Sequence, residues 1–151
     1  KKLFVKWDEK IKKDKYIYYE SDWEEFFAKD GKLISKPPWG SIISIKISDG
    51  SINWKKPFGY QDETEIGLFN SGGASITSSN LLVATGTTDN FIIIKDSSNG
   101  QTLWKFKMDA EGTAPPLIYN YQGKTFLAIL ATGGLYPNSN KASLLYIFGI
   151  K

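Results

Sequence analysis

Short apolar segments separated by polar turns occupy the chain from about residue 41 to its end. Phe91-Ile92-Ile93-Ile94, for example, is soon followed by Ser97-Ser98-Asn99-Gly100. This alternation of apolar runs with Ser, Asn, Asp and Gly clusters is typical of strands joined by tight turns. No long amphipathic helix interrupts the series. The pattern predicts an all-β fold with strands near residues 41–47, 51–57, 74–78, 80–86, 90–95, 101–107, 115–121, 124–131 and 143–149.

One phrase occurs twice: an apolar strand, a polar turn ending in Gly, and a second strand with a Trp near its start. Gly50 and Trp54 in the first copy correspond to Gly100 and Trp104 in the second, 50 residues later. A hairpin repeated every 40–50 residues or so indicates a β-propeller or a related array. We therefore expect these four residues to be structural, with each indole packed between blades and its N–H bonded to a backbone carbonyl.

A propeller blade has four strands, so counting the predicted strands assigns each part of the chain to a blade. Residues 72–108 form a complete blade, residues 37–58 the outer half of the blade before it, and residues 113–150 the inner three strands of the blade after it. Two incomplete blades of three would expose apolar faces and strand edges, which native proteins avoid. We expect the chain to be a C-terminal segment, completed by the rest of a longer polypeptide, by a second chain or by copies of itself.

Residues 1–36 differ from the rest because they carry 10 lysines and 8 acidic residues. Ser21 or Asp22 is a suitable N-cap for a short helix, followed by acidic residues in its first turn. A partner-docking arm is one interpretation of this N-terminal excursion. An irregular segment whose aromatic residues pack on the domain is the interpretation we favour.

Composition excludes several kinds of chemistry. The chain has no Cys and no His, so it has no disulfides, no Cys/His zinc sites and no triads that use His as a base. All 19 basic residues are Lys, which removes bidentate guanidinium contacts to phosphate or guanine. The net charge of +3 points to an ordinary solvated surface, and we expect no nucleic-acid partner. No apolar run approaches the length of a membrane-spanning helix. The start of the chain lacks Met and an apolar signal region, so we read it as a processed end or a cut within a longer protein.

The repeated phrase resembles the tryptophan-docking motif of pyrroloquinoline-quinone (PQQ) dehydrogenases. Asp96, Asn99, Gly100 and Trp104 fit that motif, as do Gly50 and Trp54, whereas Lys46, Ser44 and Ile94 depart from it. Further landmarks occur in the order typical of the membrane-type glucose dehydrogenase branch: Lys36-Pro37-Pro38-Trp39-Gly40, Asn70-Ser71-Gly72-Gly73, Leu81 to Asn90, Thr113-Ala114-Pro115-Pro116 with Tyr119 and Gly123, and Ala131-Thr132-Gly133-Gly134. The resemblance covers about residues 30–150.

The resemblance implies an eight-bladed propeller that holds PQQ and Ca²⁺ in its central channel, in a periplasmic protein. Such enzymes oxidise a sugar or an alcohol and pass electrons to a quinone or a cytochrome. The family's catalytic base and most of its cation ligands lie upstream of the matched part. We therefore expect no catalytic residue and no metal ligand in this segment, which alone would be inactive.

Asn70, Ser71, Gly72 and Gly73 are the candidate cofactor-binding residues, because they lead into the innermost strand of the complete blade. The Asn70 amide can hydrogen-bond a quinone carboxylate, and paired glycines let the backbone approach a flat ring. Ser71 departs from the aromatic residue that the family often has there. A tight strand start without ligand contact explains the glycines equally well.

Other candidates have simpler interpretations. Turn chemistry is favoured for Gly112-Thr113-Ala114-Pro115 and for Gly133-Gly134. A plain solvated loop is favoured over a cation site for Asp62-Glu63-Thr64-Glu65, because the spacing fits no EF-hand-like pattern. For the whole chain, the alternative to a PQQ dehydrogenase segment is a non-catalytic propeller scaffold for protein contacts. A polyanion-binding surface is a third and weaker interpretation.

Overall fold

The computed structural model describes residues 8–13, 16–20, 27–30, 33–136 and 139–150. The chain divides into two units, Lys1–Lys36 and Pro37–Lys151. All regular structure in the described residues is β-strand, as predicted, and none of it is a helix able to cross a bilayer. The helix predicted from Ser21 or Asp22 falls on residues 21–26, outside the described ranges.

The first unit contains one antiparallel hairpin. Strand β1 (Asp8–Lys13) pairs with β2 (Tyr16–Glu20), with a register shift between Glu9 and Ile11. The pattern of apolar positions did not predict this hairpin. Five of the six residues of β1 (DEKIKK) are charged, so the strand lacks the apolar alternation that marks a half-buried strand.

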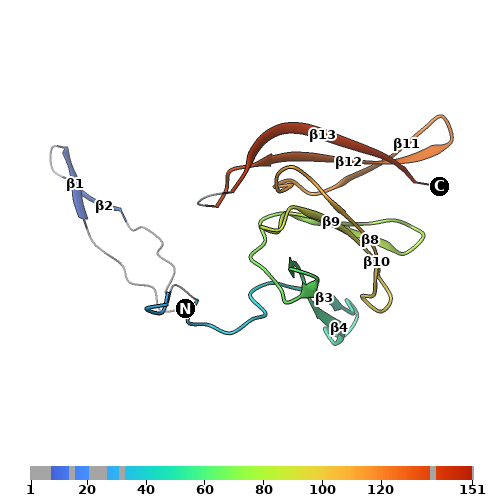
Figure 1. The fold of residues 1–151 in the computed structure, drawn as a ribbon, viewed down its shortest axis with the longest axis horizontal. Helices are drawn as coiled ribbons and strands as arrows, with labels where there is room; N and C mark the ends of the chain where they lie inside the picture. The colour runs from blue at the N-terminus through green and yellow to red at the C-terminus, as the bar shows by residue number, and fades with distance from the viewer. Residues whose placement is uncertain (1–7, 14–15, 21–26, 31–32, 137–138, 151) are drawn as a thin grey trace. The chain divides into compact units, whose positions relative to one another are not determined.

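The second unit is built from three main sheets, which Figure 1 shows as successive layers. The first is the pair β3 (Ser41–Ile45) and β4 (Ile52–Pro57). The second is a four-stranded sheet of β7 (Ala74–Ile76), β8 (Leu81–Ala84), β9 (Phe91–Asp96) and β10 (Thr102–Lys107), in spatial order β10-β9-β8-β7. The third contains β11 (Leu117–Tyr121), β12 (Lys124–Gly133) and β13 (Lys141–Ile150), in that order.

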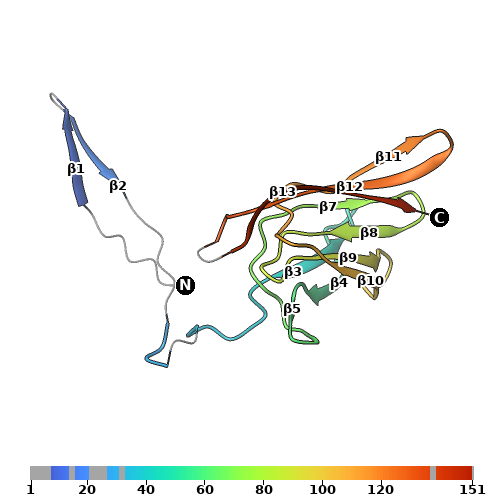
Figure 2. The ribbon, with the colours of Figure 1, turned by 45° about the horizontal axis from the view of Figure 1, so that its top comes forward.

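Each of these strands overlaps a strand expected from the sequence, and the sheets are antiparallel throughout. The sequence did not reveal a short hairpin made of β5 (Tyr60–Gln61) and β6 (Thr64–Glu65), visible beside β4 in Figure 2. Its two-residue strands are too short to show any periodicity.

Antiparallel pairing places the turns at two opposite ends of the four-stranded sheet. Strands β7 and β9 begin, and β8 and β10 end, at the same end, as the pairs Ala74↔Ala84 and Phe91↔Lys107 show. We call this the Asn70 end, because Asn70 lies just before β7. The opposite end carries the turn Ser97–Gly100, and we call it the Gly100 end. All loops that lead from one sheet to the next lie at the Asn70 end.

Strand β9 is buried on both faces, and this explains its continuous apolar run. Ile92 belongs to the core shared with the three-stranded sheet, together with Leu127 and Ile129. Ile93, on the opposite face, packs with Phe58 in the core shared with the two-stranded sheet. The four-stranded sheet is therefore the middle layer of the unit.

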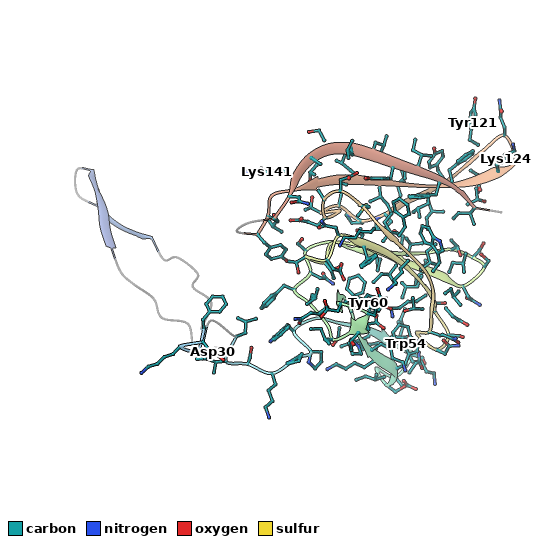
Figure 3. The ribbon with its side chains drawn as sticks, viewed as in Figure 1. Asp30, Trp54, Tyr60, Tyr121, Lys124 and Lys141 are labelled. Atoms are coloured by element: carbon teal, nitrogen blue, oxygen red, sulfur yellow. The ribbon has the colours of Figure 1, made fainter. Side chains whose placement is uncertain are left out.

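The two repeated tryptophans have different surroundings. The Trp54 indole N–H donates to the Ser97 carbonyl oxygen at 2.9 Å, which joins the two-stranded sheet to the next one (Figure 3). Trp104 lies edge-on to Phe148, 5.6 Å between ring centroids, in the interface with the three-stranded sheet. Its indole makes no hydrogen bond to any residue that the structure describes, so the expected bond from Trp104 to a backbone carbonyl stays a prediction.

The two flanking sheets expose apolar side chains on their outer faces. On β3, Ile42 packs into the core, whereas Ile43 and Ile45 are 43% and 56% exposed. On β13, Tyr146 and Phe148 pack inward, and the alternating Leu145 and Ile147 are 62% and 54% exposed. Exposed apolar faces of this kind are the mark of sheets that normally contact further sheets. The unit is a propeller fragment with incomplete flanking blades.

Candidate functional site

The segment Asn70–Gly73 runs along the turn that follows β8. Asn70 forms an isolated antiparallel bridge with Thr87, and the Ser71 N–H donates to the Gly86 carbonyl oxygen at 3.0 Å. The backbone of Asn70 is thus held on both sides. Its side chain is exposed and makes no hydrogen bond to the described residues, so both its donor and its acceptor remain available to a ligand.

The Ser71 hydroxyl is directed at the protein's own backbone. Its hydroxyl lies 3.4 Å from the Gly86 carbonyl oxygen, the same oxygen that accepts its backbone N–H. The side chain is half-buried and satisfied within the chain. Ser71 therefore strengthens the local turn and offers little to a bound molecule.

The paired glycines are required by the protein's own backbone. A Cβ on Gly72 would lie 2.2 Å from the Thr85 carbonyl oxygen and 2.8 Å from the Gly112 carbonyl oxygen. A Cβ on Gly73 would lie 2.8 Å from Cγ of Pro115. These distances are shorter than any real contact, so a side chain at either position would displace the neighbouring chain. Close packing of the two strand starts is enough to explain both glycines.

The same close packing brings the loop before β11 into the site. Gly112 lies between Thr85 and Ile129, since its Cβ would be 2.7 Å from the Thr85 hydroxyl and 3.0 Å from Cγ2 of Ile129. Thr113 and Thr132 share a hydroxyl–hydroxyl hydrogen bond of 2.9 Å. Gly112 and Thr113 are thus used in contacts within the protein.

Gly133 and Gly134 have left-handed backbone, with φ of 59° and 78°. A Cβ on Gly133 would also meet the Asn140 carbonyl oxygen at 1.8 Å. Such positions favour glycine strongly, in agreement with turn chemistry.

Two buried polar side chains at the Asn70 end have no hydrogen-bond partner among the residues that the structure describes. They are Thr85, through its hydroxyl, and Glu111, through both carboxylate oxygens, and both residues are fully buried. The Glu111 backbone is fixed, because its carbonyl oxygen accepts the Gly133 N–H at 3.0 Å. The sequence did not single out either residue, because nothing in a local pattern shows that a Glu in a loop becomes sealed between two sheets.

The β5–β6 hairpin corrects one expectation. We expected Asp62 to Glu65 to be a plain solvated loop, but the Glu65 carboxylate accepts a hydrogen bond of 2.6 Å from Lys95, whose side chain is 1% exposed. Glu63 pairs with Lys105 at 2.8 Å. The hydrogen bond to Glu63 raises the pKa of Lys105 and, from the other side, lowers the pKa of Glu63. The ion pairs of Glu63 and Glu65 hold the β5–β6 hairpin against the four-stranded sheet.

A divalent cation would need more oxygen ligands than one carboxylate can supply. Among the described residues, no three Asp, Glu, His or Cys side chains gather closely enough to hold a metal ion. Any cation bound near Asn70 would therefore take most of its ligands from elsewhere.

Comparison with known proteins identifies the family. The family model "PQQ: Glucose/ethanol/alcohol dehydrogenase, beta-propeller domain" matches residues 2–127. The chain belongs to this family. The match begins near the N-terminus and so includes most of the charged excursion, which the motif resemblance did not reach.

Several curated relatives of this PQQ propeller segment are dehydrogenases. It is 29% identical over 119 residues to the quinoprotein glucose dehydrogenase of Escherichia coli K12, covering 72% of this chain and 15% of that protein. It is 26% identical over 140 residues to the glycerol dehydrogenase large subunit of Gluconobacter thailandicus, covering 85% of this chain and 18% of that protein. The PQQ propeller segment thus spans about a sixth of the length of these relatives.

A solved structure supports the fold of this PQQ propeller segment. A quinohemoprotein alcohol dehydrogenase from Pseudomonas putida HK5 superposes with a TM-score of 0.50 at 22% identity, over 60% of this chain and 12% of that one. The likeness agrees with the strand pattern: an all-β fragment of a propeller.

Proposed function

We propose that this chain is part of a PQQ-dependent dehydrogenase that oxidises a sugar or an alcohol. In this proposal the Asn70 amide binds the cofactor from one side of the channel. Family membership supports the reaction class. The observation that carries the site is the exposed Asn70 side chain, free of hydrogen bonds to the described residues and mounted on a backbone fixed by Thr87 and Gly86.

The candidate residues have unequal roles in this proposal. Asn70 presents an amide that can both donate to a carboxylate and accept from an N–H. Gly72 and Gly73 set the path of the chain that carries Asn70, because only glycine permits the approach of Thr85 and Pro115. Ser71 braces the turn. When bound, PQQ would supply the two-electron redox chemistry and a divalent cation such as Ca²⁺ would act as a Lewis acid.

The segment contributes to binding and leaves proton abstraction to other parts of the protein. Its only buried carboxyl group near the site among the described residues, Glu111, is sealed from solvent and cannot reach a bound substrate without rearrangement. We infer that the catalytic base and most cation ligands come from other blades. Those blades would also cover the exposed apolar faces of β3 and β13.

Electron acceptor and location follow from the relatives by analogy. Their names include a quinate/shikimate dehydrogenase (quinone) of Acinetobacter baylyi and subunit 1 of a methanol dehydrogenase [cytochrome c] of Methylobacterium organophilum. We propose a quinone or a cytochrome as acceptor and a periplasmic location, with glucose, glycerol and simple alcohols as the first substrates to test.

A non-catalytic scaffold is the second candidate function. The observation in its favour is Ser71, whose hydroxyl turns toward Gly86 at a position where the family often has an aromatic residue. A propeller that had lost its cofactor would tolerate this change and keep its sheet packing.

Binding of PQQ separates the two candidates. The full-length protein containing this chain is freed of metal with a chelator and titrated with PQQ and Ca²⁺, with absorbance and dye reduction as readouts. We expect saturable binding, which Asn70→Ala weakens by about three- to tenfold through loss of one or two hydrogen bonds. Asn53→Ala is the control and leaves the affinity unchanged, because it removes an exposed amide on β4 that donates to the Ser44 hydroxyl at 3.2 Å, away from the Asn70 end. A full-length protein that neither binds PQQ nor reduces dye with any substrate would favour the scaffold.

A further inference from the structure

Asp89 occupies the turn between β8 and β9 at the Asn70 end, and its carboxylate joins two distant parts of the chain. Oδ1 accepts hydrogen bonds from the Thr87 hydroxyl at 2.5 Å and from the Phe91 N–H at 3.0 Å. Oδ2 accepts one from the Tyr60 N–H at 2.5 Å. The first two bonds shape the turn, and the third reaches 29 residues back along the chain to the β5–β6 hairpin.

Three contacts hold the Tyr60 side chain in place. Its ring stands edge-on to Phe91, 5.9 Å between centroids, and the Lys105 ammonium lies 4.4 Å from its centre. Its hydroxyl lies 3.3 Å from the Thr102 hydroxyl (Figure 3). A donor held this firmly gives the Asp89 carboxylate a rigid anchor outside its own turn.

The turn that Asp89 shapes is the one that holds the candidate cofactor residues. Thr87, fully buried, pairs with Asn70, and Gly86 accepts the Ser71 N–H. The neighbouring Asn90 carbonyl oxygen accepts a hydrogen bond from the Met108 N–H at 2.9 Å. The start of the loop before β11 is therefore attached to the same turn. Any shift of this turn would move the backbone that carries the Asn70 amide.

We propose that Asp89 is a positioning residue: by tying Tyr60 to the Thr87 turn, its carboxylate holds the Asn70 amide where the cofactor binds. The inference rests on the proposed function. A carboxylate suits the task because its two oxygens accept all three bonds, whereas an Asn has a single acceptor oxygen and must release Tyr60 or the turn donors.

The same sheet provides a matched control at its other end. Asp96 accepts hydrogen bonds from the Ser98 N–H, the Ser98 hydroxyl and the Asn99 amide, at 2.8, 2.6 and 3.1 Å. All three donors lie within three residues of Asp96, at the Gly100 end. Removing the Asp96 carboxylate therefore disrupts a comparable turn without touching the Asn70 end.

The experiment compares Asp89→Ala, Asp89→Asn and Asp96→Ala in the full-length protein. Hydrogen exchange is measured without cofactor, and the PQQ dissociation constant is measured by titration with Ca²⁺ present. We expect D89A to speed exchange of the Tyr60 and Ser71 amides and to weaken PQQ binding by about tenfold or more, as loss of an outer-shell partner does. D89N keeps one acceptor oxygen, so it should speed exchange of the Tyr60 and Ser71 amides less than D89A does. D96A speeds exchange only near residues 97–101 and changes PQQ affinity less than about twofold.

Each outcome decides one of the two claims. Unchanged exchange at Ser71 in D89A would overturn the positioning role, whatever the protein binds. Equal loss of PQQ affinity in D89A and D96A would also overturn it, because a general loss of stability would then explain both. If the unaltered protein fails to bind PQQ, the proposed function is wrong, and the exchange data still decide whether Asp89 holds the Asn70 backbone.

Discussion

The ring of Trp54 lies directly on Gly100. A Cβ at Gly100 would be 2.8 Å from Cε3 and 2.9 Å from Cζ3 of the indole, while the indole N–H bonds to Ser97 in the same turn. The Trp of the first repeated phrase is therefore seated on the turn of the second. The two features that repeat along the chain, Gly in the turn and Trp four residues later, are complementary parts of one sheet-to-sheet contact.

Gly100→Ala should destabilise the chain more than Gly50→Ala. Both glycines have left-handed backbone, with φ of 74° and 72°, so each substitution carries the conformational cost of about 1 kcal/mol. Only Gly100 has Trp54 above it, because a Cβ at Gly50 meets nothing within 4 Å. We expect G100A to lower the free energy of unfolding by about 1–3 kcal/mol more than G50A, as overpacking does. Urea denaturation of both variants measures the difference, and equal losses would show that the ring yields without cost.

The half-buried Glu65 and the fully buried Glu111 should respond in opposite ways when each is replaced by Gln. Glu65→Gln removes the charge that pairs with buried Lys95 and should lower the free energy of unfolding by about 2–4 kcal/mol. Glu111→Gln removes a buried carboxyl group that has no hydrogen-bond partner among the described residues, and should raise the free energy of unfolding by about 1–2 kcal/mol.

Thermal and urea unfolding of this pair, with the unaltered chain as reference, test the prediction. Destabilisation by E111Q would mean that the Glu111 carboxylate has a partner in solution. A neutral E65Q would mean that the hydrogen bond that the Lys95 ammonium already donates to the Thr102 hydroxyl is enough to hold it.

The first repeated turn predicts a pH effect with a definite sign. The Lys46 ammonium, the Ser51 hydroxyl and the Ser51 N–H all bond to Asp49 and lower the pKa of its carboxyl from 3.8 to about 2. Because the pKa in the folded state lies below that of the unfolded chain, the stabilisation from Asp49 is complete above pH 3.8 and is lost as the pH falls through about 2.

Lys46→Gln should raise the pKa of Asp49 toward its ordinary value, since Lys46 makes the largest contribution. Carboxyl carbon chemical shifts followed by NMR from pH 1 to 6 or so report this pKa directly. Asp96 is the internal control, because Ser98 and Asn99 lower its pKa and Lys46 does not contribute. A pKa of Asp49 that K46Q leaves unchanged would show that the two Ser51 bonds suffice.

Local pattern was enough for the strands of the three main sheets, because strand alternation and turn residues act over a few positions. Ile92 and Ile93 already indicate a strand covered on both faces, and Gly100 already indicates a left-handed turn. A strand made mostly of charged residues shows no alternation of apolar and polar positions, so β1 was not predicted although it has six residues. The β5–β6 hairpin was missed because each of its strands has two residues, too few to show an alternation of apolar and polar positions.

The candidate site was located by sequence and explained only by tertiary structure. The order of the motifs led to Asn70–Gly73, but the reason for the glycines lies in Thr85, Gly112 and Pro115, which reach them through the packing of neighbouring sheets. The ion pair of Lys95 with Glu65 and the bond from Tyr60 to Asp89 are likewise invisible along the chain, since they join residues about 30 positions apart.

For this protein, the sequence by itself determined the all-β class, the repeating Gly-to-Trp phrase and, through that phrase, the propeller family. These properties follow from short-range preferences of backbone and side chain. Tertiary structure alone decided that the Trp54 indole bonds to Ser97 and that the Ser71 hydroxyl turns toward Gly86. It also decided that Glu111 is buried with no hydrogen-bond partner among the described residues. The physical reason is that hydrogen-bond partners and burial are set by which sheets face one another, and no local pattern records that choice.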